Sequence, residues 1–198
     1  MGKRQLAALE TRRKLIQAAE KLIRERGFDH VSVSDIAAEA GVAKGSFYTY
    51  FQRKEDVVYE IAQDQFATAE ERAREIPDVT GQVWTFLEAS MEYIQETGLH
   101  VCQQWLRNVA DQSDLQGKEK LRYDLDVLRK LLQEAAERGE LRRDTPAETL
   151  ARCIAAQYYG AVSLWAISNG EQDPMSILRT YAEGALPGLI QPRRQGKE

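Results

Sequence analysis

The chain has 198 residues, of which 43% are hydrophobic, and a formal net charge of −4. This length and composition fit one sizeable domain or two small ones that share a core, and they exclude a disordered protein and a small disulfide-stabilised scaffold. The two cysteines, Cys102 and Cys153, belong to no paired metal or redox motif, and we find no export signal and no uncharged apolar run of about 18 residues. We therefore expect a cytoplasmic protein that is not inserted in a membrane.

Charge is unevenly distributed along the chain. Residues 1–54 contain eleven basic and six acidic residues, which gives +5, whereas residues 55–198 contain sixteen basic and twenty-five acidic residues, which gives −9. Because only the local field at a contact surface attracts a polyanion, this division fits a DNA-facing region on an acidic body. Two solvated surfaces of different charge explain it equally well.

Apolar residues recur with a helical period. One stripe predicts a helix over residues 10–26 that ends at Gly27, and it consists of Leu15, Ala19, Leu22 and Ile23. The same spacing precedes Gly98 and Gly139, in the sets Val83, Leu87, Met91, Ile94 and Leu121, Leu125, Leu128, Leu132. No hairpin turn of the Asn-Gly type lies between alternating β-branched runs. The pattern predicts an all-α protein of about nine helices.

Helix starts are also visible in the sequence. Ser32 and Asp35 predict a capping box, in which a hydroxyl and a carboxylate each accept a free backbone N–H. The segment 145–148 (Thr-Pro-Ala-Glu) predicts a second box with proline at the first helical position, and Asp173 followed by proline predicts another helix start.

A long helix is predicted over residues 145–169, and it is apolar around most of its circumference. Such a helix must be covered on several sides, and only one short helix, over residues 174–186, follows it. We expect a second copy of the chain to cover it, so that both segments form a homodimer interface. The alternative is a central helix in the core of a monomer.

Residues 31–54 predict two short helices joined by a turn at Gly41-Val42, which is a helix-turn-helix. Its inward positions are apolar: Ile36, Ala37, Val42, Phe47 and Phe51. The outward positions of the second helix instead carry hydroxyl, aromatic and basic residues, namely Lys44, Ser46, Tyr48, Thr49 and Tyr50. With Arg53 and Lys54 beside them, these side chains can contact phosphates and base edges, and Gly45 allows close approach of the backbone to a duplex.

This region resembles the TetR/AcrR family of bacterial transcriptional regulators. The motifs that match cover some 45 residues and lie at 11–19, 26–28, 32–37, 40–51 and 54–56. The resemblance implies a DNA-binding head over residues 1–54 with three helices, the third of them in the major groove, and a ligand-binding and dimerisation body over residues 55–198. The residues expected at the DNA are Arg12, Ser32, Lys44, Gly45, Ser46, Tyr48, Thr49, Tyr50, Arg53 and Lys54, the last as a phosphate anchor.

Two positions depart from the family pattern. Ala43 stands at the cap of the recognition helix, where the family often has serine or threonine, and this costs about 1 kcal/mol of capping energy and one hydroxyl. Arg53 stands where a small polar residue is usual, and its guanidinium can restore a phosphate contact.

The body is expected to hold an apolar cavity edged by a few polar groups, because that is the usual form of a small-molecule site. The expected lining residues are Phe66, Trp84, Glu88, Met91, Gln103, Trp105, Tyr123 and Tyr158. For each of them taken alone, ordinary core packing is the competing explanation. A cationic aromatic ligand would follow if Glu88 or Glu92 points inward.

Together these features predict a repressor that a small apolar or aromatic effector releases from a palindromic operator, through a shift of the helix that begins at Lys54. We expect no catalytic residue, metal or cofactor. A redox sensor would depend on Cys102 and Cys153, and an enzyme on His30 and His100, which lack the Glu-x-x-His spacing of di-iron bundles. A third alternative is an interaction module that has lost DNA binding.

Overall fold

The computed structural model describes residues 3–109, 115–141 and 144–190. Within these ranges it contains no β-strand, which confirms the all-α class. Ten α-helices and one 3-10 turn follow one another as α1 (Lys3–Arg26), η1 (Phe28–His30), α2 (Val33–Glu39), α3 (Lys44–Tyr50), α4 (Lys54–Arg74), α5 (Val79–Thr97), α6 (Leu99–Val109), α7 (Leu115–Glu137), α8 (Ala147–Ile167), α9 (Pro174–Gly184) and α10 (Leu186–Leu189). The addition to the expected nine is the four-residue α10.

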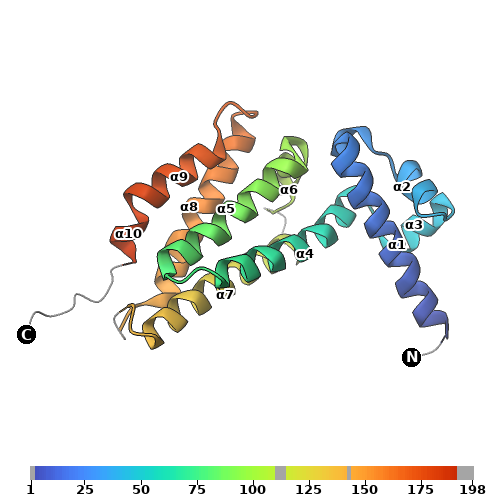
Figure 1. Cartoon of the computed structure of the whole chain (residues 1–198). Helices are drawn as coiled ribbons and strands as arrows, with labels where there is room; N and C mark the ends of the chain where they lie inside the picture. Colours follow the sequence, from blue (N-terminus) through green and yellow to red (C-terminus); the bar gives the residue numbers. More distant parts are fainter. Residues whose placement is uncertain (1–2, 110–114, 142–143, 191–198) are drawn as a thin grey trace, which may run out of the picture.

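The helices form a small head and a larger body joined by α4 (Figure 1). Buried apolar side chains fall into two clusters, one in the head and one in the body. The long helix α4 supplies Val57 and Ile61 to the head cluster, and Ala69 and Ala73 to the body cluster. One continuous helix is therefore part of both cores.

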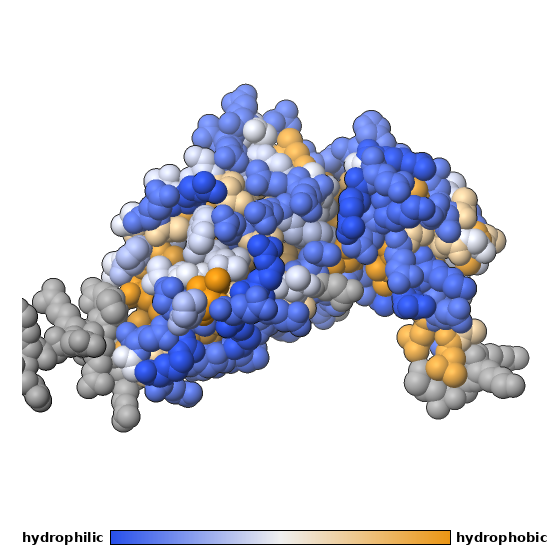
Figure 2. Space-filling model, in the orientation of Figure 1, coloured by the Kyte–Doolittle hydropathy of each residue, from blue (hydrophilic) through white to orange (hydrophobic). Residues whose placement is uncertain are grey.

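The first helix is longer than the sequence predicted, since α1 begins at Lys3 and not near residue 10. The preceding segment, Gln-Leu-Ala-Ala-Leu at 5–9, consists of good helix formers and contains no breaker, although it has no core to cover. Leu6 and Leu9 are consequently 53% and 54% exposed, and Figure 2 shows apolar surface at this end of the molecule. The predicted end is confirmed, because Gly27 takes a φ of 79° directly after α1.

The expected helix starts are largely confirmed. The capping box of α2 is present, with the Ser32 hydroxyl accepting from the Asp35 N–H at 3.2 Å. Asp173 caps α9 by accepting from two backbone N–H groups. The helix α8 begins one residue later than expected, because Pro146 is its N-cap and not its first helical residue.

The body is organised around α8, which packs against α6, α7 and α9. Its buried face carries Ala151, Ile154, Ala155, Tyr158, Ala161 and Val162. On the opposite face Leu164 and Ile167 are 51% and 77% exposed. The helix is thus apolar on more sides than this chain covers.

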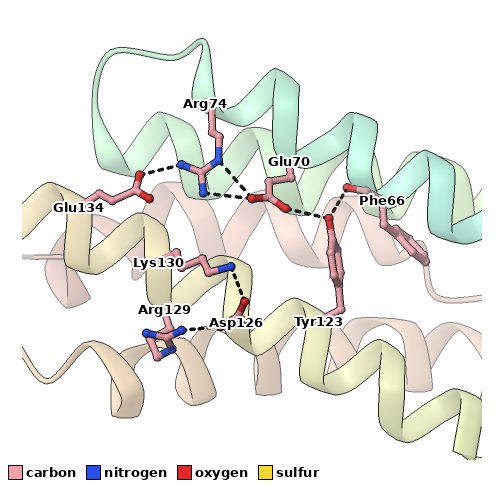
Figure 3. A network of polar contacts seen from close by, with 8 residues as sticks. All are labelled: Phe66, Glu70, Arg74, Tyr123, Asp126, Arg129, Lys130 and Glu134. Carbon is pink, nitrogen blue, oxygen red and sulfur yellow. Dashed lines mark hydrogen bonds and ion pairs between the residues drawn. The ribbon is translucent and has the colours of Figure 1, made fainter.

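A chain of polar contacts ties α4 to α7 (Figure 3). The Arg74 guanidinium donates to the carboxylates of Glu70 at 3.0 Å and Glu134 at 2.7 Å. The Tyr123 hydroxyl lies 2.9 Å from the Glu70 carboxylate and 3.2 Å from the backbone carbonyl oxygen of Phe66, and it can donate to either. These contacts hold α7, from Tyr123 to Glu134, against the second half of α4, from Phe66 to Arg74.

Candidate functional site

The helix α3 presents a polar face because its apolar side is fixed inside the head. Phe47 is fully buried and packs against Phe51, with ring centroids 5.4 Å apart. The opposite face exposes Lys44, Gly45, Tyr48 and Thr49, whereas Ser46 and Tyr50 are half-buried. Tyr48 is 53% exposed, which is unusual for a large aromatic side chain without a partner to bind.

No neighbouring atom of the chain requires a glycine at position 45. A Cβ atom built at this position would meet nothing within 4 Å, and its backbone is ordinary helix. Alanine would suit an isolated helix better by about 1 kcal/mol. The absence of a side chain is therefore consistent with close approach of an external molecule to the α3 backbone, as expected for a recognition helix.

The other head residues expected at the DNA have contacts of their own. Arg12 pairs with Glu60 at 2.5 Å, and its guanidinium lies 5.5 Å from the centre of the Phe51 ring. Ser32 is exposed while it caps α2, so its hydroxyl is near the surface. Arg53 is half exposed and makes only a loose contact of 3.4 Å with Asp56.

Lys54 differs from its expected role as a phosphate anchor. Its ammonium donates to the backbone carbonyl oxygens of Phe28 at 2.7 Å and Val31 at 2.8 Å, and it lies 3.8 Å from the centre of the Phe28 ring. Burial lowers the pKa of this lysine. The side chain therefore fastens the start of α4 to the segment between α1 and α2.

We expect Lys54→Met to destabilise the protein by about 2 kcal/mol, because two carbonyl oxygens lose a charged donor. Urea unfolding of the full chain measures this loss. The salt dependence of DNA binding should stay unchanged, since no phosphate contact is removed. Normal stability together with a salt slope reduced by about one would instead restore Lys54 as a phosphate ligand.

A cavity of about 130 Å³ lies alongside α4. Its walls come from five helices, α4 to α8, and are mostly apolar or aromatic; the lining residues are Arg53, Glu55, Val58, Ala62, Phe66, Tyr93, Ile94, Thr97, Val101, Cys102, Gln104, Trp105, Lys120, Tyr158, Tyr159 and Val162. From Arg53 to Phe66 it follows α4 for about 20 Å, at a rise of 1.5 Å per residue. The cavity is thus long and narrow.

Three of the eight residues expected to line a ligand site do line this cavity, namely Phe66, Trp105 and Tyr158. Sequence periodicity identifies the apolar face of a helix, but it does not say whether that face meets a cavity or another helix. The agreement for these three residues is therefore partly a matter of chance. The Trp105 ring stacks on Tyr159, with centroids 5.7 Å apart and planes inclined by 18°. This stacked pair forms a rigid part of the wall.

The structure does not bring the other five to the cavity. Each has another place: Met91 and Trp84 in or against the body core, Glu88 beside Arg179, Gln103 bonded to α8, and Tyr123 in the contact with α4. Glu88 lies 3.7 Å from Arg179 near the surface. Glu92 is 51% exposed and lies 4.0 Å from Arg72. The expectation of a cationic aromatic ligand, which depended on an inward Glu88 or Glu92, therefore loses its support.

Sequence reasoning missed Lys120, which is 8% exposed and lines the cavity. Its ammonium forms an ion pair with Asp124, one turn along α7, and lies 3.6 Å from the centre of the Phe66 ring. Asp124 also accepts from the Tyr159 hydroxyl at 2.7 Å. Burial lowers the pKa of Lys120, and the neighbouring carboxylate opposes that shift. A Lys-Asp pair four residues apart is typical of a solvated helix face, so no sequence signal distinguished it.

Comparison with known proteins places the chain in a family. The family model of bacterial regulatory proteins, tetR family, matches residues 15–61, which include α2 and α3. The fatty acid metabolism regulator protein of Bacillus subtilis is 27% identical over 88% of this chain and 93% of its own length. The transcriptional repressor DhaR of a Mycobacterium species is 26% identical over 92% of this chain and 96% of its own.

The chain belongs to the TetR family. Solved structures have the same fold, among them the fatty acid degradation regulator FadR of Bacillus halodurans, with a TM-score of 0.61, 25% identity and coverage of 92% of this chain and 97% of that one. FadR of Thermus thermophilus, solved with lauroyl-CoA, has a TM-score of 0.68, 20% identity and coverage of 94% and 99%. This TetR-family chain is accordingly a ligand-responsive, DNA-binding transcriptional regulator.

Head and cavity of this TetR-family regulator are in contact through α6. The His100 imidazole stacks near the Phe28 ring, with centroids 6.5 Å apart. The next residues of α6, Val101 and Cys102, line the cavity, and Phe28 is the residue over which the Lys54 ammonium lies. The helix α6 therefore contacts both the cavity and the joint between the head and α4.

Cys102 does not support redox sensing by this regulator. Burial raises the pKa of the Cys102 thiol to about 11, so the reactive thiolate is scarce at neutral pH. Cys102 and Cys153 are both free thiols. In the described ranges no helix is long and apolar enough to span a membrane, and no group of three or more His, Cys, Asp or Glu side chains is placed to hold a metal ion.

Proposed function

We propose that the chain is a repressor that binds a palindromic operator as a homodimer and leaves it when an elongated apolar effector enters the cavity along α4. The observation that carries this proposal is the position of α4. Its first turns pack in the head through Val57 and Ile61, and another face of the same helix, from Glu55 to Phe66, forms one wall of the cavity. A ligand that fits only one position of α4 changes the spacing of the two heads and hence their fit to two half-sites.

The proposed division into a head over residues 1–54 and a body over residues 55–198 follows the two core clusters with one qualification. Val57 and Ile61, beyond the division, belong to the head cluster. We therefore propose the start of α4 as the boundary in the sequence, with its first turns shared by the two parts in space.

For the effector we propose a medium- or long-chain acyl thioester of coenzyme A. The cavity is lined mostly by apolar and aromatic side chains and extends for about 20 Å beside α4, which suits an alkyl chain. Arg53 lies at its exposed end, where a guanidinium can pair with a phosphate outside the cavity. Support also comes from the relatives, since FadR of Thermus thermophilus was solved with lauroyl-CoA and FadR of Bacillus subtilis with stearoyl-CoA.

A release assay tests this function. We expect the full chain to bind an operator selected from a random DNA pool, and dodecanoyl-CoA or octadecanoyl-CoA to reduce the bound fraction in a mobility shift. Free coenzyme A is the control, and it should leave the complex intact because it lacks the chain that fills the cavity. Undiminished DNA binding with both thioesters at saturating concentration excludes this effector class.

A variant of the contact between α6 and the head can separate the binding of operator and effector from the release of DNA. His100→Ala removes the imidazole that stacks near Phe28 but leaves the cavity wall and α3 in place. We expect the variant to bind operator and acyl-CoA with affinities close to those of the wild type, while release requires about tenfold more thioester. Unaltered release shows that coupling does not pass through this contact.

The proposed dimer interface consists of α8 and α9, and its evidence is the exposed apolar face of α8. Replacing Leu164 and Ile167 together by glutamate places two charges on this face. We expect the double variant to be monomeric in light scattering after size exclusion, and the wild type to be dimeric. Lys130→Glu, on the exposed side of α7, is the matched control and should stay dimeric. A monomeric wild type contradicts the proposed assembly.

A further inference from the structure

The two ends of the cavity differ in their polar groups. At the end near the head, Arg53 has a side chain that is 52% exposed, so the cavity is open there. At the end near Phe66, the Lys120 side chain is only 9% exposed and the Asp124 side chain 4%. An elongated ligand that enters beside Arg53 therefore brings its far end to Lys120.

Resting on the proposed function, we propose that the effector carries an uncharged oxygen, as a hydroxyl or carbonyl group, at the end that reaches Lys120. An alkyl chain with a plain methyl end fits the middle of the cavity but not this end. At the inner end the wall carries a buried charged group, Lys120, whose ion-pair partner is Asp124. Three helices meet there: α4 with Phe66, α7 with Lys120, and α8 with Tyr158 and Tyr159.

The ammonium of Lys120 has donor capacity to spare. A protonated lysine has three N–H donors. Within the described part of the chain, the ammonium of Lys120 donates a hydrogen bond to Asp124 alone. Its other neighbours are the aromatic faces of Phe66, 3.6 Å from the nitrogen, and Tyr158, 5.8 Å away. A ring face is a weaker acceptor than an oxygen, so a ligand oxygen improves the surroundings of this nitrogen.

The charge balance decides between an uncharged oxygen and a carboxylate. Lys120 and Asp124 together are neutral, and Asp124 already accepts from Tyr159. A ligand carboxylate would add an uncompensated charge beside the Asp124 carboxylate in a buried place. A hydroxyl or carbonyl oxygen accepts from Lys120 without changing the net charge.

A hydrogen bond to Lys120 would make a hydroxylated chain bind more tightly than a plain one, which is the opposite of the order expected from burial alone. Moving a hydroxyl from water into an apolar pocket is unfavourable, so a plain chain should bind more tightly than its hydroxylated analogue unless a hydrogen-bonding partner is waiting. With Lys120 as that partner, we expect 12-hydroxydodecanoyl-CoA to bind about tenfold more tightly than dodecanoyl-CoA. The thioester of dodecanedioic acid, which ends in a carboxylate, should bind less tightly than either.

Isothermal titration of the full chain with these three thioesters tests the proposal. Equal affinities, or tighter binding of the plain chain, overturn it, and tightest binding of the carboxylate overturns the preference for an uncharged group. Two variants locate the effect. Asp124→Asn keeps the donors of Lys120 and should keep the preference, whereas the double variant Lys120→Met with Asp124→Asn should lose it. The double variant removes both charges, so no unpaired ion remains to unfold it.

A second pair of probes keeps this test separate from the proposed effector class. If none of the thioesters binds, acyl-CoA is excluded as the effector. The preference for an oxygen at Lys120 is then tested with hexan-1-ol and hexane, two small probes that need no headgroup. Tighter binding of hexan-1-ol by the wild type, reversed in the double variant, supports it. Tighter binding of hexane by the wild type, or a preference that the double variant retains, overturns it.

Discussion

Tyr48→Ala is expected to weaken operator binding by about 1–3 kcal/mol while leaving the fold intact. The side chain is 53% exposed on α3, so its loss opens no cavity in the head. Its ring lies edge-on against Phe47, with centroids 5.5 Å apart, which orients it on the outer face of the helix. Fluorescence anisotropy with a selected operator measures the affinity, and thermal unfolding checks the stability.

A companion variant, Lys44→Ala, distinguishes base reading from phosphate contact. Lys44 is exposed at the first position of α3, and its removal should weaken binding to all sequences alike and reduce the salt slope by about one. Lys130→Ala on α7 is the matched control, because it removes an exposed lysine from a helix of the body. If Tyr48→Ala and Lys44→Ala both bind as the wild type does, α3 is not the helix that reads DNA.

Phe47→Ala, one residue away, should weaken DNA binding by destabilising the head and not by removing a contact with DNA. Phe47 is fully buried between Tyr48 and Phe51 in the head cluster, and truncation of such a phenylalanine destabilises a protein by about 3–5 kcal/mol. We expect a lower unfolding midpoint in urea, and loss of DNA binding because α3 is no longer held. A stability within about 1 kcal/mol of the wild type would show that the head tolerates this cavity, contrary to its packing.

The local structure of the head could be predicted because its signals are local. The Ser32 cap, the turn at Gly41 and the stop at Gly27 each depend on residues within one helical turn, and all three are present. The contacts that Lys54 makes within the chain could not be predicted for the same reason. Its partners, the carbonyl oxygens of Phe28 and Val31, are more than twenty residues away in sequence, and no local pattern refers to them.

The cavity could be predicted only in part. Helical periodicity places Met91 in the apolar stripe of a helix. It gives no information on whether that stripe faces a cavity or a packed neighbour, and Met91 is in fact fully buried in the core. Lys120 and Asp124 follow a spacing that is usual on surfaces, yet both are buried, and Lys120 lines the cavity. Contacts between helices, which determine both outcomes, are set by the rotation of each helix about its axis.

The shared helix α4 has a thermodynamic consequence. Because the same helix completes the apolar clusters of the head and of the body, neither part can unfold without exposing side chains that the other one covers. Mass action then makes any molecule bound in the body protect the whole chain, by RT ln(1 + [L]/Kd). The effector that ends DNA binding should therefore raise the melting temperature of the DNA-reading head, so that the released repressor is the more heat-resistant form.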